Sequence, residues 1–134
     1  MDCIFCKIIA GEIPAVKIYE DESVLAFLDI TPVNLGHTLV IPKQHFANLL
    51  ELPDDLLCLL AQAVKKIAPA VMAGVSAQGF NLGLNNGSVA GQLVGHFHWH
   101  IMPRFEADGY KLWHGKQYEA GQADEVAEKI KENL

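Results

Sequence analysis

The sequence predicts an α+β domain with an antiparallel sheet and two main helices. Three observations predict it: several short apolar segments bounded by turn residues, one long segment with helical hydrophobic spacing, and a short amphipathic segment near the C-terminus. The chain has 134 residues, 51% of them hydrophobic and 19% charged. We therefore expect one domain over residues 1–134 with a buried core, in which a tail from about residue 105 ends in a short helix.

The expected strands are apolar or alternating runs that end at turn residues or at proline. Pro42 ends the third of these runs and Pro103 the last, and the turn signal Asn85-Asn86-Gly87 follows the fourth. The five expected strands cover residues 15–20, 24–28, 37–41, 80–85 and 95–102.

The longest helix is expected to begin at Pro53, because proline suits the first turn and Asp54 and Asp55 favour the positive end of the helix dipole. Pro69 should kink or end this helix early. A second helix is expected over residues 124–133, with acidic residues early and lysines late. The stripe expected to face the core consists of Leu56, Leu59, Leu60, Ala63, Val64, Ile67 and Val71.

The charge of the chain narrows the class of partner. A formal net charge of −6 argues against a nucleic-acid partner or an anionic membrane surface. No run of about 20 apolar residues predicts a membrane span, and the N-terminus lacks a basic stretch followed by a long apolar run. We therefore expect a cytoplasmic protein that binds neither membranes nor nucleic acid.

The three cysteines divide into a close pair, Cys3 and Cys6, and a lone Cys58. In a reducing compartment the pair favours metal or redox chemistry over a structural disulfide. Cys58 is expected to be a small buried apolar residue. A zinc site would need two more donors, and the sequence offers His37, His45, His96, His114 and Cys58. His114 lies in a polar stretch and is expected to be a surface residue.

The segment His96-Phe97-His98-Trp99-His100 is the most informative part of the chain. On a strand the three histidines would share one face, about 7 Å apart, and the apolar residues between them would face the core. Imidazole can ligate a metal, transfer protons or attack phosphorus. Three histidines in strict alternation favour such chemistry over an exposed strand face that carries histidines by chance.

Residues 91–104, GQLVGHFHWHIMPR, resemble the signature of the histidine-triad (HIT) family. Residues 3–14, 25–30 and 36–43 resemble further segments of the bacterial Hit/Hint branch, in the same order. The resemblance implies a HIT-like fold, a homodimer, and a purine nucleotide or nucleotide conjugate as ligand. It also implies attack of the middle histidine on the α-phosphorus, giving a nucleotidyl-histidine that water then cleaves.

The resemblance also implies roles for individual residues. His98 matches the nucleophile, His100 the third histidine beside the phosphate, and His37 the upstream histidine of the active site. Asp29 matches the carboxylate that binds the ribose hydroxyls, and Leu93 stands where the branch often has a phosphate-binding serine. The implied catalytic set is His98, His100, His37 and Gln92. The implied nucleotide-binding set is Asp29, Asn85, Ile4, Phe5, Ile8, Phe27, Ile30, Leu39, Leu93 and Val94.

For the cysteine pair, the resemblance implies a structural zinc ion held by Cys3, Cys6, His45 and His96. Four protein donors close the coordination shell and leave no place for a reactive water. A free dithiol or redox pair is the alternative, but the strand-to-helix context of thioredoxin-like motifs is missing.

Several activities remain open. Cleavage of the P–N bond in nucleoside 5′-phosphoramidates is preferred, and hydrolysis of dinucleoside polyphosphates is the alternative within the family. A nucleotide-binding regulator with little turnover and a zinc-dependent binding module are the alternatives from other classes.

Overall fold

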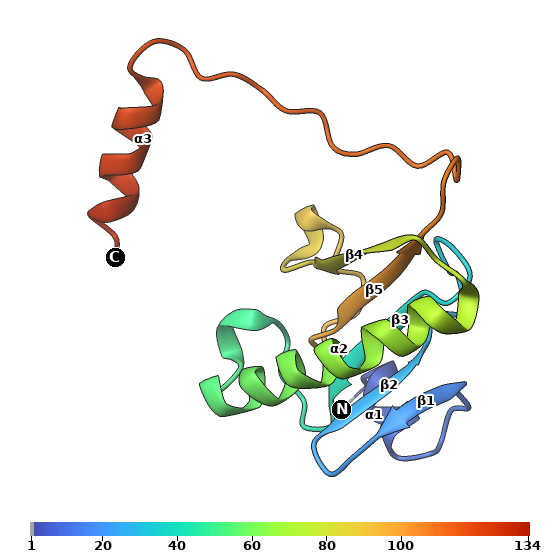
Figure 1. Ribbon diagram of the computed structural model, residues 1–134. Coiled ribbons are helices and arrows are strands. Elements are labelled where there is room, and N and C mark those ends of the chain that lie inside the picture. Colours follow the sequence, from blue (N-terminus) through green and yellow to red (C-terminus); the bar gives the residue numbers. More distant parts are fainter. Residues whose placement is uncertain (1) are drawn as a thin grey trace.

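The computed structural model describes residues 2–134 and has a five-stranded antiparallel sheet in the order β1-β2-β3-β5-β4 (Figure 1). This arrangement confirms the predicted α+β class. The strands are β1 (Lys17–Glu20), β2 (Val24–Leu28), β3 (Thr38–Pro42), β4 (Gly79–Leu84) and β5 (Trp99–Arg104). The first four lie within two residues of the expected bounds.

The long helix α2 (Asp54–Val75) covers one face of the sheet. It buries Leu60, Ala63, Val64, Ile67, Ala68 and Val71. Of the two outcomes predicted for Pro69, a kink or an early end, the early end was wrong, because α2 continues to Val75. Pro69 and Lys65 lie on the exposed side, where the Lys65 carbonyl that loses its intrahelical partner can reach water. By length and hydropathy α2 could also span a membrane, but here its apolar stripe packs on the sheet.

Two positions on α2 differ from the expectation. Cys58 is exposed, because helical spacing places it on the far side of α2 from the buried Leu60 and Val64. Leu59 is also exposed and lies at the edge of the buried stripe.

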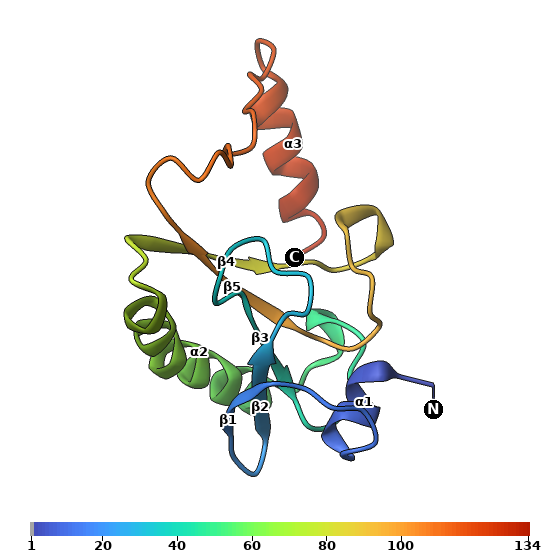
Figure 2. The same cartoon turned by 90° about the vertical axis from the view of Figure 1, so that its right-hand side faces the viewer.

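The sequence did not predict the six-residue helix α1 (Ile4–Ile9), which is too short to show a clear hydrophobic period. It lies on the face of the sheet opposite α2 (Figure 2). Alternation along β2 separates the two cores, since Val24 and Ala26 pack toward α2 whereas Leu25 and Phe27 pack toward α1. The N-cap of α1 is Cys3, whose Sγ accepts a hydrogen bond from the Cys6 amide at 3.4 Å.

The last strand begins four residues later than expected, at Trp99, and continues through Pro103 to Arg104. Before Trp99 the chain bonds elsewhere, because the Phe97 amide donates to the Phe46 carbonyl at 2.7 Å. Pro103 is tolerated because it pairs only with β4, beyond the last β3 pair at Ile101. His96 and His98 therefore precede the strand, and only His100 lies within it.

Residues 111–134 form a C-terminal arm that runs away from the sheet (Figures 1 and 2). The arm ends in helix α3 (Gln122–Lys131), two residues earlier than expected, with the predicted early acids and late lysines. The aromatic side chains of the arm are exposed, with Trp113 98% exposed and Tyr118 66% exposed. His114 is exposed, as predicted.

Candidate functional site

Four histidines lie close together near the paired strands β3 and β5: His37, His96, His98 and His100. His37 directly precedes β3, His98 directly precedes β5, and His100 pairs with Leu39 across the two strands. His96 and His98 both face Phe5 of α1, with ring centroids 5.9 Å and 5.2 Å from that ring. The expected alternation is therefore confirmed, since Phe97 packs in the core beneath α2.

The protonation of His98 follows from one contact. Its Nδ1 lies 2.7 Å from the His96 carbonyl oxygen. Because a carbonyl only accepts hydrogen bonds, Nδ1 of the neutral ring carries the proton and Nε2 keeps its lone pair. Within residues 2–134 no hydrogen bond occupies that Nε2. His98 thus presents an unprotonated nitrogen, as a nucleophile requires.

His37 and His100 are ordered in the same way by a backbone amide. The Val33 N–H donates to His37 Nδ1 at 3.0 Å, so the His37 proton must lie on Nε2. His37 Nε2 in turn lies 2.9 Å from His100 Nδ1 and donates to it. The His100 proton therefore lies on Nε2, a buried atom that has no hydrogen-bond partner in the described chain. This N–H group is therefore a buried donor without a protein acceptor among residues 2–134.

Burial keeps both rings neutral. It lowers the pKa of His37, against the opposing effect of Asp29. Burial, with smaller effects of His98 and His37, lowers the pKa of His100 to about 4. At neutral pH both imidazoles therefore hold one proton each, which the ordered chain of hydrogen bonds requires.

Asp29 lies beside this pair, with Oδ2 3.6 Å from His37 Nε2. Its Oδ1 accepts from the Thr31 amide at 2.8 Å and from the Thr31 hydroxyl at 3.2 Å. The other carboxylate oxygen is free to accept hydrogen bonds from a ligand.

The two amide side chains hold the loop that precedes the histidines. Gln92 accepts from the Gly87 amide and donates to the Ala47 and Val94 carbonyls, at 2.9, 2.6 and 3.0 Å. Asn85 donates to the Gly91 carbonyl at 3.4 Å. In this structure Gln92 therefore fixes the loop rather than presenting a free amide.

The expected apolar walls divide into two groups. Phe5, Ile8, Phe27 and Leu39 are buried together in the core beneath α1, where Phe5 meets His98. Ile30 and Leu93 are exposed. Ile4, Leu93 and Val94 line a cavity of about 480 Å³ that also reaches two of the expected metal ligands, Cys3 and His45.

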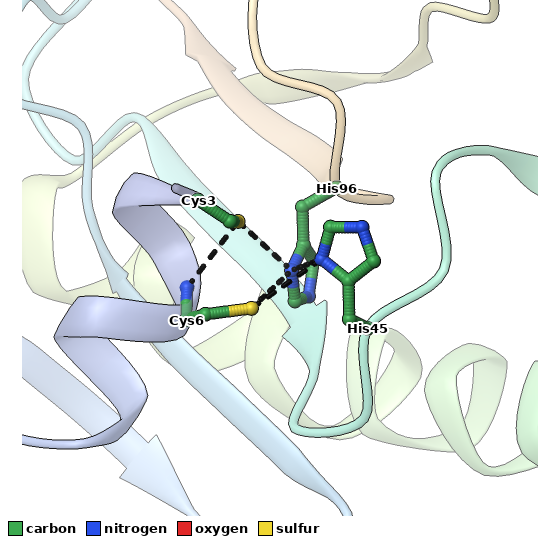
Figure 3. Close-up of side chains that lie close together, drawn as sticks. All are labelled: Cys3, Cys6, His45 and His96. Atoms are coloured by element: carbon green, nitrogen blue, oxygen red, sulfur yellow. Dashed lines mark hydrogen bonds between the residues drawn. The ribbon is translucent and has the colours of Figure 1, made fainter. Parts of the chain in front are cut away.

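Cys3, Cys6, His45 and His96 converge from three parts of the chain (Figure 3). The Cys3 Sγ and Cys6 Sγ atoms lie 3.5 and 3.6 Å from His96 Nδ1. Cys6 Sγ lies 3.3 Å from His45 Nδ1, and the two Nδ1 atoms are 3.2 Å apart. In a tetrahedral zinc site, the edges would be about 3.6 Å between sulfur and nitrogen and about 3.3 Å between two nitrogens. The donor atoms thus have the spacing of a zinc site.

The orientation of His96 also fits a metal. Its Nε2 donates to the Pro42 carbonyl at 2.8 Å, which leaves a lone pair on Nδ1 facing the sulfurs. Burial, followed by the neighbouring Cys3 thiol, raises the pKa of Cys6. A cation would balance the thiolates that such a site requires.

Asp29, His37 and His100 form a second group of converging ligand atoms. The Val33 amide makes this group a poor metal site. It occupies His37 Nδ1, so a metal on Nε2 would require a fully deprotonated imidazolate. The group is better suited to ordering protons.

The sequence did not reveal the two main-chain groups that order the histidines, the Val33 amide and the His96 carbonyl. Every residue carries a carbonyl and all but proline an N–H, so no residue type marks these contacts.

The sequence of the chain matches a known protein family. The HIT domain family model matches residues 10–107. An uncharacterised HIT-like protein of Methanocaldococcus jannaschii is 53% identical over 129 residues, covering 96% of this chain and 98% of that protein. The adenosine 5′-monophosphoramidase of Candida albicans is 39% identical, covering 98% of this chain and 91% of that protein.

Two crystal structures extend the comparison. A HIT family protein from Bacillus subtilis superposes with a TM-score of 0.92 at 46% identity, covering 100% of this chain and 98% of that chain. A zinc-bound histidine-triad protein from Mycobacterium smegmatis gives a TM-score of 0.79 at 36% identity, covering 100% and 99%. The chain belongs to the HIT domain family.

Proposed function

We propose that the protein is a nucleotide hydrolase that acts at the α-phosphorus of nucleoside 5′-phosphoramidates through a nucleotidyl-His98 intermediate. One observation carries the proposal: the lone pair of His98 Nε2 and the N–H of His100 Nε2, which has no partner among residues 2–134, belong to neighbouring rings with centroids 4.8 Å apart. A nucleophile beside a donor for a phosphate oxygen is the pair that phosphoryl chemistry needs.

In the first step, His98 Nε2 attacks the α-phosphorus and the P–N bond breaks. His98 Nδ1 keeps its proton and donates it in a hydrogen bond to the His96 carbonyl, which stabilises the charge that develops on the ring. The departing amine takes a proton from solvent. Water then attacks the phosphorus and the P–Nε2 bond breaks. The proton that water loses returns to solvent and replaces the one that the amine took.

Asp29 and the core beneath α1 are the proposed contacts for the rest of the nucleotide. We propose that the free Asp29 carboxylate oxygen accepts hydrogen bonds from a ribose and that the core beneath α1 forms an apolar floor; the position of Asp29 beside His37 supports this. The name of the C. albicans relative, an adenosine 5′-monophosphoramidase, supports a purine phosphoramidate. With a net charge of −6, the ligand is a small molecule rather than a nucleic acid.

The test compares wild type with His98→Ala on adenosine 5′-phosphoramidate and on a diadenosine polyphosphate. His114→Ala is the matched control, because His114 is exposed on the arm. We expect His98→Ala to lose turnover, His114→Ala to keep it, and mass spectrometry of quenched wild type to map the nucleotide to His98. Equal turnover in wild type and His98→Ala would refute the nucleophile. Preference for the polyphosphate would favour the alternative hydrolase, and tight nucleotide binding without turnover would favour a regulator.

We also propose that Cys3, Cys6, His45 and His96 hold a structural zinc ion. The donor spacing and the His96 orientation support it. Bound zinc would join the N-terminal helix to the segment that carries His98, and would take no part in the chemistry. Elemental analysis should find about one zinc per chain in wild type and in His98→Ala. Cys3→Ser combined with His45→Ala should lose it, and full retention in that double variant would exclude this ligand set.

We further propose a homodimer in the cytoplasm, whose reducing conditions keep the cysteines free to bind metal. β4 ends the sheet, and its Phe80 and Leu82 are 41% and 44% exposed beside α2. Together with Met72 and Trp99 they line an apolar groove of about 670 Å³. A second copy would cover this surface. Light scattering should give twice the chain mass, and Leu82→Glu should give the monomer; a monomeric wild type would exclude the dimer.

A further inference from the structure

We propose that Tyr110 is a positioning residue that holds His37 and His100 in the required tautomers, an inference that rests on the proposed function. Tyr110 lies at the root of the C-terminal arm and does not touch either histidine. It acts through Val33, the residue whose amide orders the histidine pair.

Tyr110 reaches the site through the backbone of Val33, whose carbonyl and amide belong to two different peptide units and make two separate hydrogen bonds. The Tyr110 hydroxyl donates to the Val33 carbonyl at 2.9 Å. The Val33 amide donates to His37 Nδ1 at 3.0 Å, and His37 Nε2 donates to His100 Nδ1 at 2.9 Å. The last group in this series is His100 Nε2, a buried donor without a partner in the part of the chain that the structure describes. The Tyr110 bond holds the position of Val33, and from the Val33 amide onward each link fixes the direction of the next, because a backbone N–H only donates and a neutral imidazole donates from one nitrogen.

Tyr110 is itself held firmly, although half of its surface is exposed. Its carbonyl accepts from Arg104 Nη2 at 2.8 Å, and its amide donates to Asp108 Oδ1 at 3.0 Å. The Arg104 guanidinium lies 5.8 Å from the centre of the tyrosine ring. The hydroxyl therefore meets Val33 from a fixed support rather than from a free loop.

The same support reaches the next residue of the loop. Asn34 Nδ2 donates to the Pro103 carbonyl at 2.9 Å and to Asp108 Oδ2 at 3.0 Å. The Arg104 guanidinium and further hydrogen bonds hold the pKa of Asp108 well below its usual range, so Asp108 remains an acceptor. Hydrogen bonds from the segment 103–110 thus hold residues 33 and 34 in place, and the Val33 amide directs His37.

The position of the Val33 amide decides which nitrogens of His37 and His100 carry protons. If the Val33 amide moves away, His37 can place its proton on Nδ1 and accept at Nε2. His100 Nδ1 must then donate, and His100 Nε2 becomes an acceptor that repels a phosphate oxygen. Tyr110 is therefore expected to affect turnover more than binding, because the lost donor serves the developing charge.

The experiment compares Tyr110→Phe, which keeps the ring over Arg104 and removes only the hydroxyl, with Tyr118→Phe as matched control. Tyr118 is an exposed arm tyrosine whose hydroxyl makes no hydrogen bond within residues 2–134. For adenosine 5′-phosphoramidate we expect Tyr110→Phe to lower kcat about three- to tenfold, the worth of one neutral hydrogen bond, and to change KM by less than about twofold. Tyr118→Phe should match wild type.

The second readout needs no substrate. The ¹⁵N shifts of His37 should show a protonated Nε2 in wild type and a mixture of tautomers in Tyr110→Phe, with the thermal unfolding midpoint confirming that both are folded. A wild-type His37 protonated at Nδ1 would overturn the proposal, and so would a Tyr110→Phe protein with wild-type tautomer and kcat. If wild type fails to turn over the phosphoramidate but the tautomer still depends on Tyr110, the proposed function fails and the positioning role stands.

Discussion

Acidification should destabilise the protein through His100, and the size of the effect follows from its burial. The pKa of His100 is about 4 in the folded protein, whereas an unfolded histidine titrates at about 6.5. Between about pH 6.5 and about pH 4, His100 therefore binds a proton in the unfolded chain but not in the folded protein. Stability is fully present above that pH and falls as the pH drops.

The magnitude can be worked out from those two values. Between about pH 7 and about pH 5 the His100 contribution should lower the free energy of unfolding by about 2 kcal/mol. Below the folded pKa the loss should level off at about 3 kcal/mol. His37, whose pKa burial also lowers, adds a loss in the same direction.

The assay is urea denaturation of wild type and His100→Asn at both pH values. Asparagine keeps an acceptor for His37 Nε2 but does not titrate. The difference between the two proteins isolates His100, since acid release of a bound metal affects both. His114→Asn, at an exposed histidine, should behave as wild type. If wild type and His100→Asn lose the same free energy, the reasoning about His100 is wrong.

Three further substitutions test the fold around the site. Phe97→Ala empties a core position that is 1% exposed and should cost about 3–5 kcal/mol in chemical denaturation. Gly36→Ala should cost at least about 1 kcal/mol in the same assay, because φ is +87° and the added Cβ would lie 2.9 Å from Val75 Cγ1. Gln92→Ala removes three hydrogen bonds of the loop and should speed amide hydrogen exchange over residues 87–94, with little change in α2.

Much of the fold could be predicted because its strands are bounded by local signals. Pro42 and the turn after residue 84 mark strand ends in the sequence, and the spacing of Leu60, Val64 and Ile67 marks the buried side of α2. The start of β5 could not be predicted, because it depends on the Phe97 amide bonding to Phe46, in a loop far away in sequence.

The site was predictable to the extent that it is made of side chains. The alternation of His96, His98 and His100 with apolar residues predicted their common side, and the structure gathers the four expected metal ligands. The tautomers could not be predicted, because main-chain groups set them. The exposure of the aromatic residues in the arm could not be predicted either, because it depends on the path of the backbone relative to the sheet.

His96 has two attachments that belong to different parts of the protein. Its ring meets the cysteines of the N-terminal segment, and its carbonyl holds His98. His96 follows Cys6 by 90 residues and Cys3 by 93 residues in the sequence. A contact between residues this far apart can form only after the whole segment between them has been synthesised. The position of His98 is thus tied to a contact that closes over most of the sheet, rather than to its own neighbours alone.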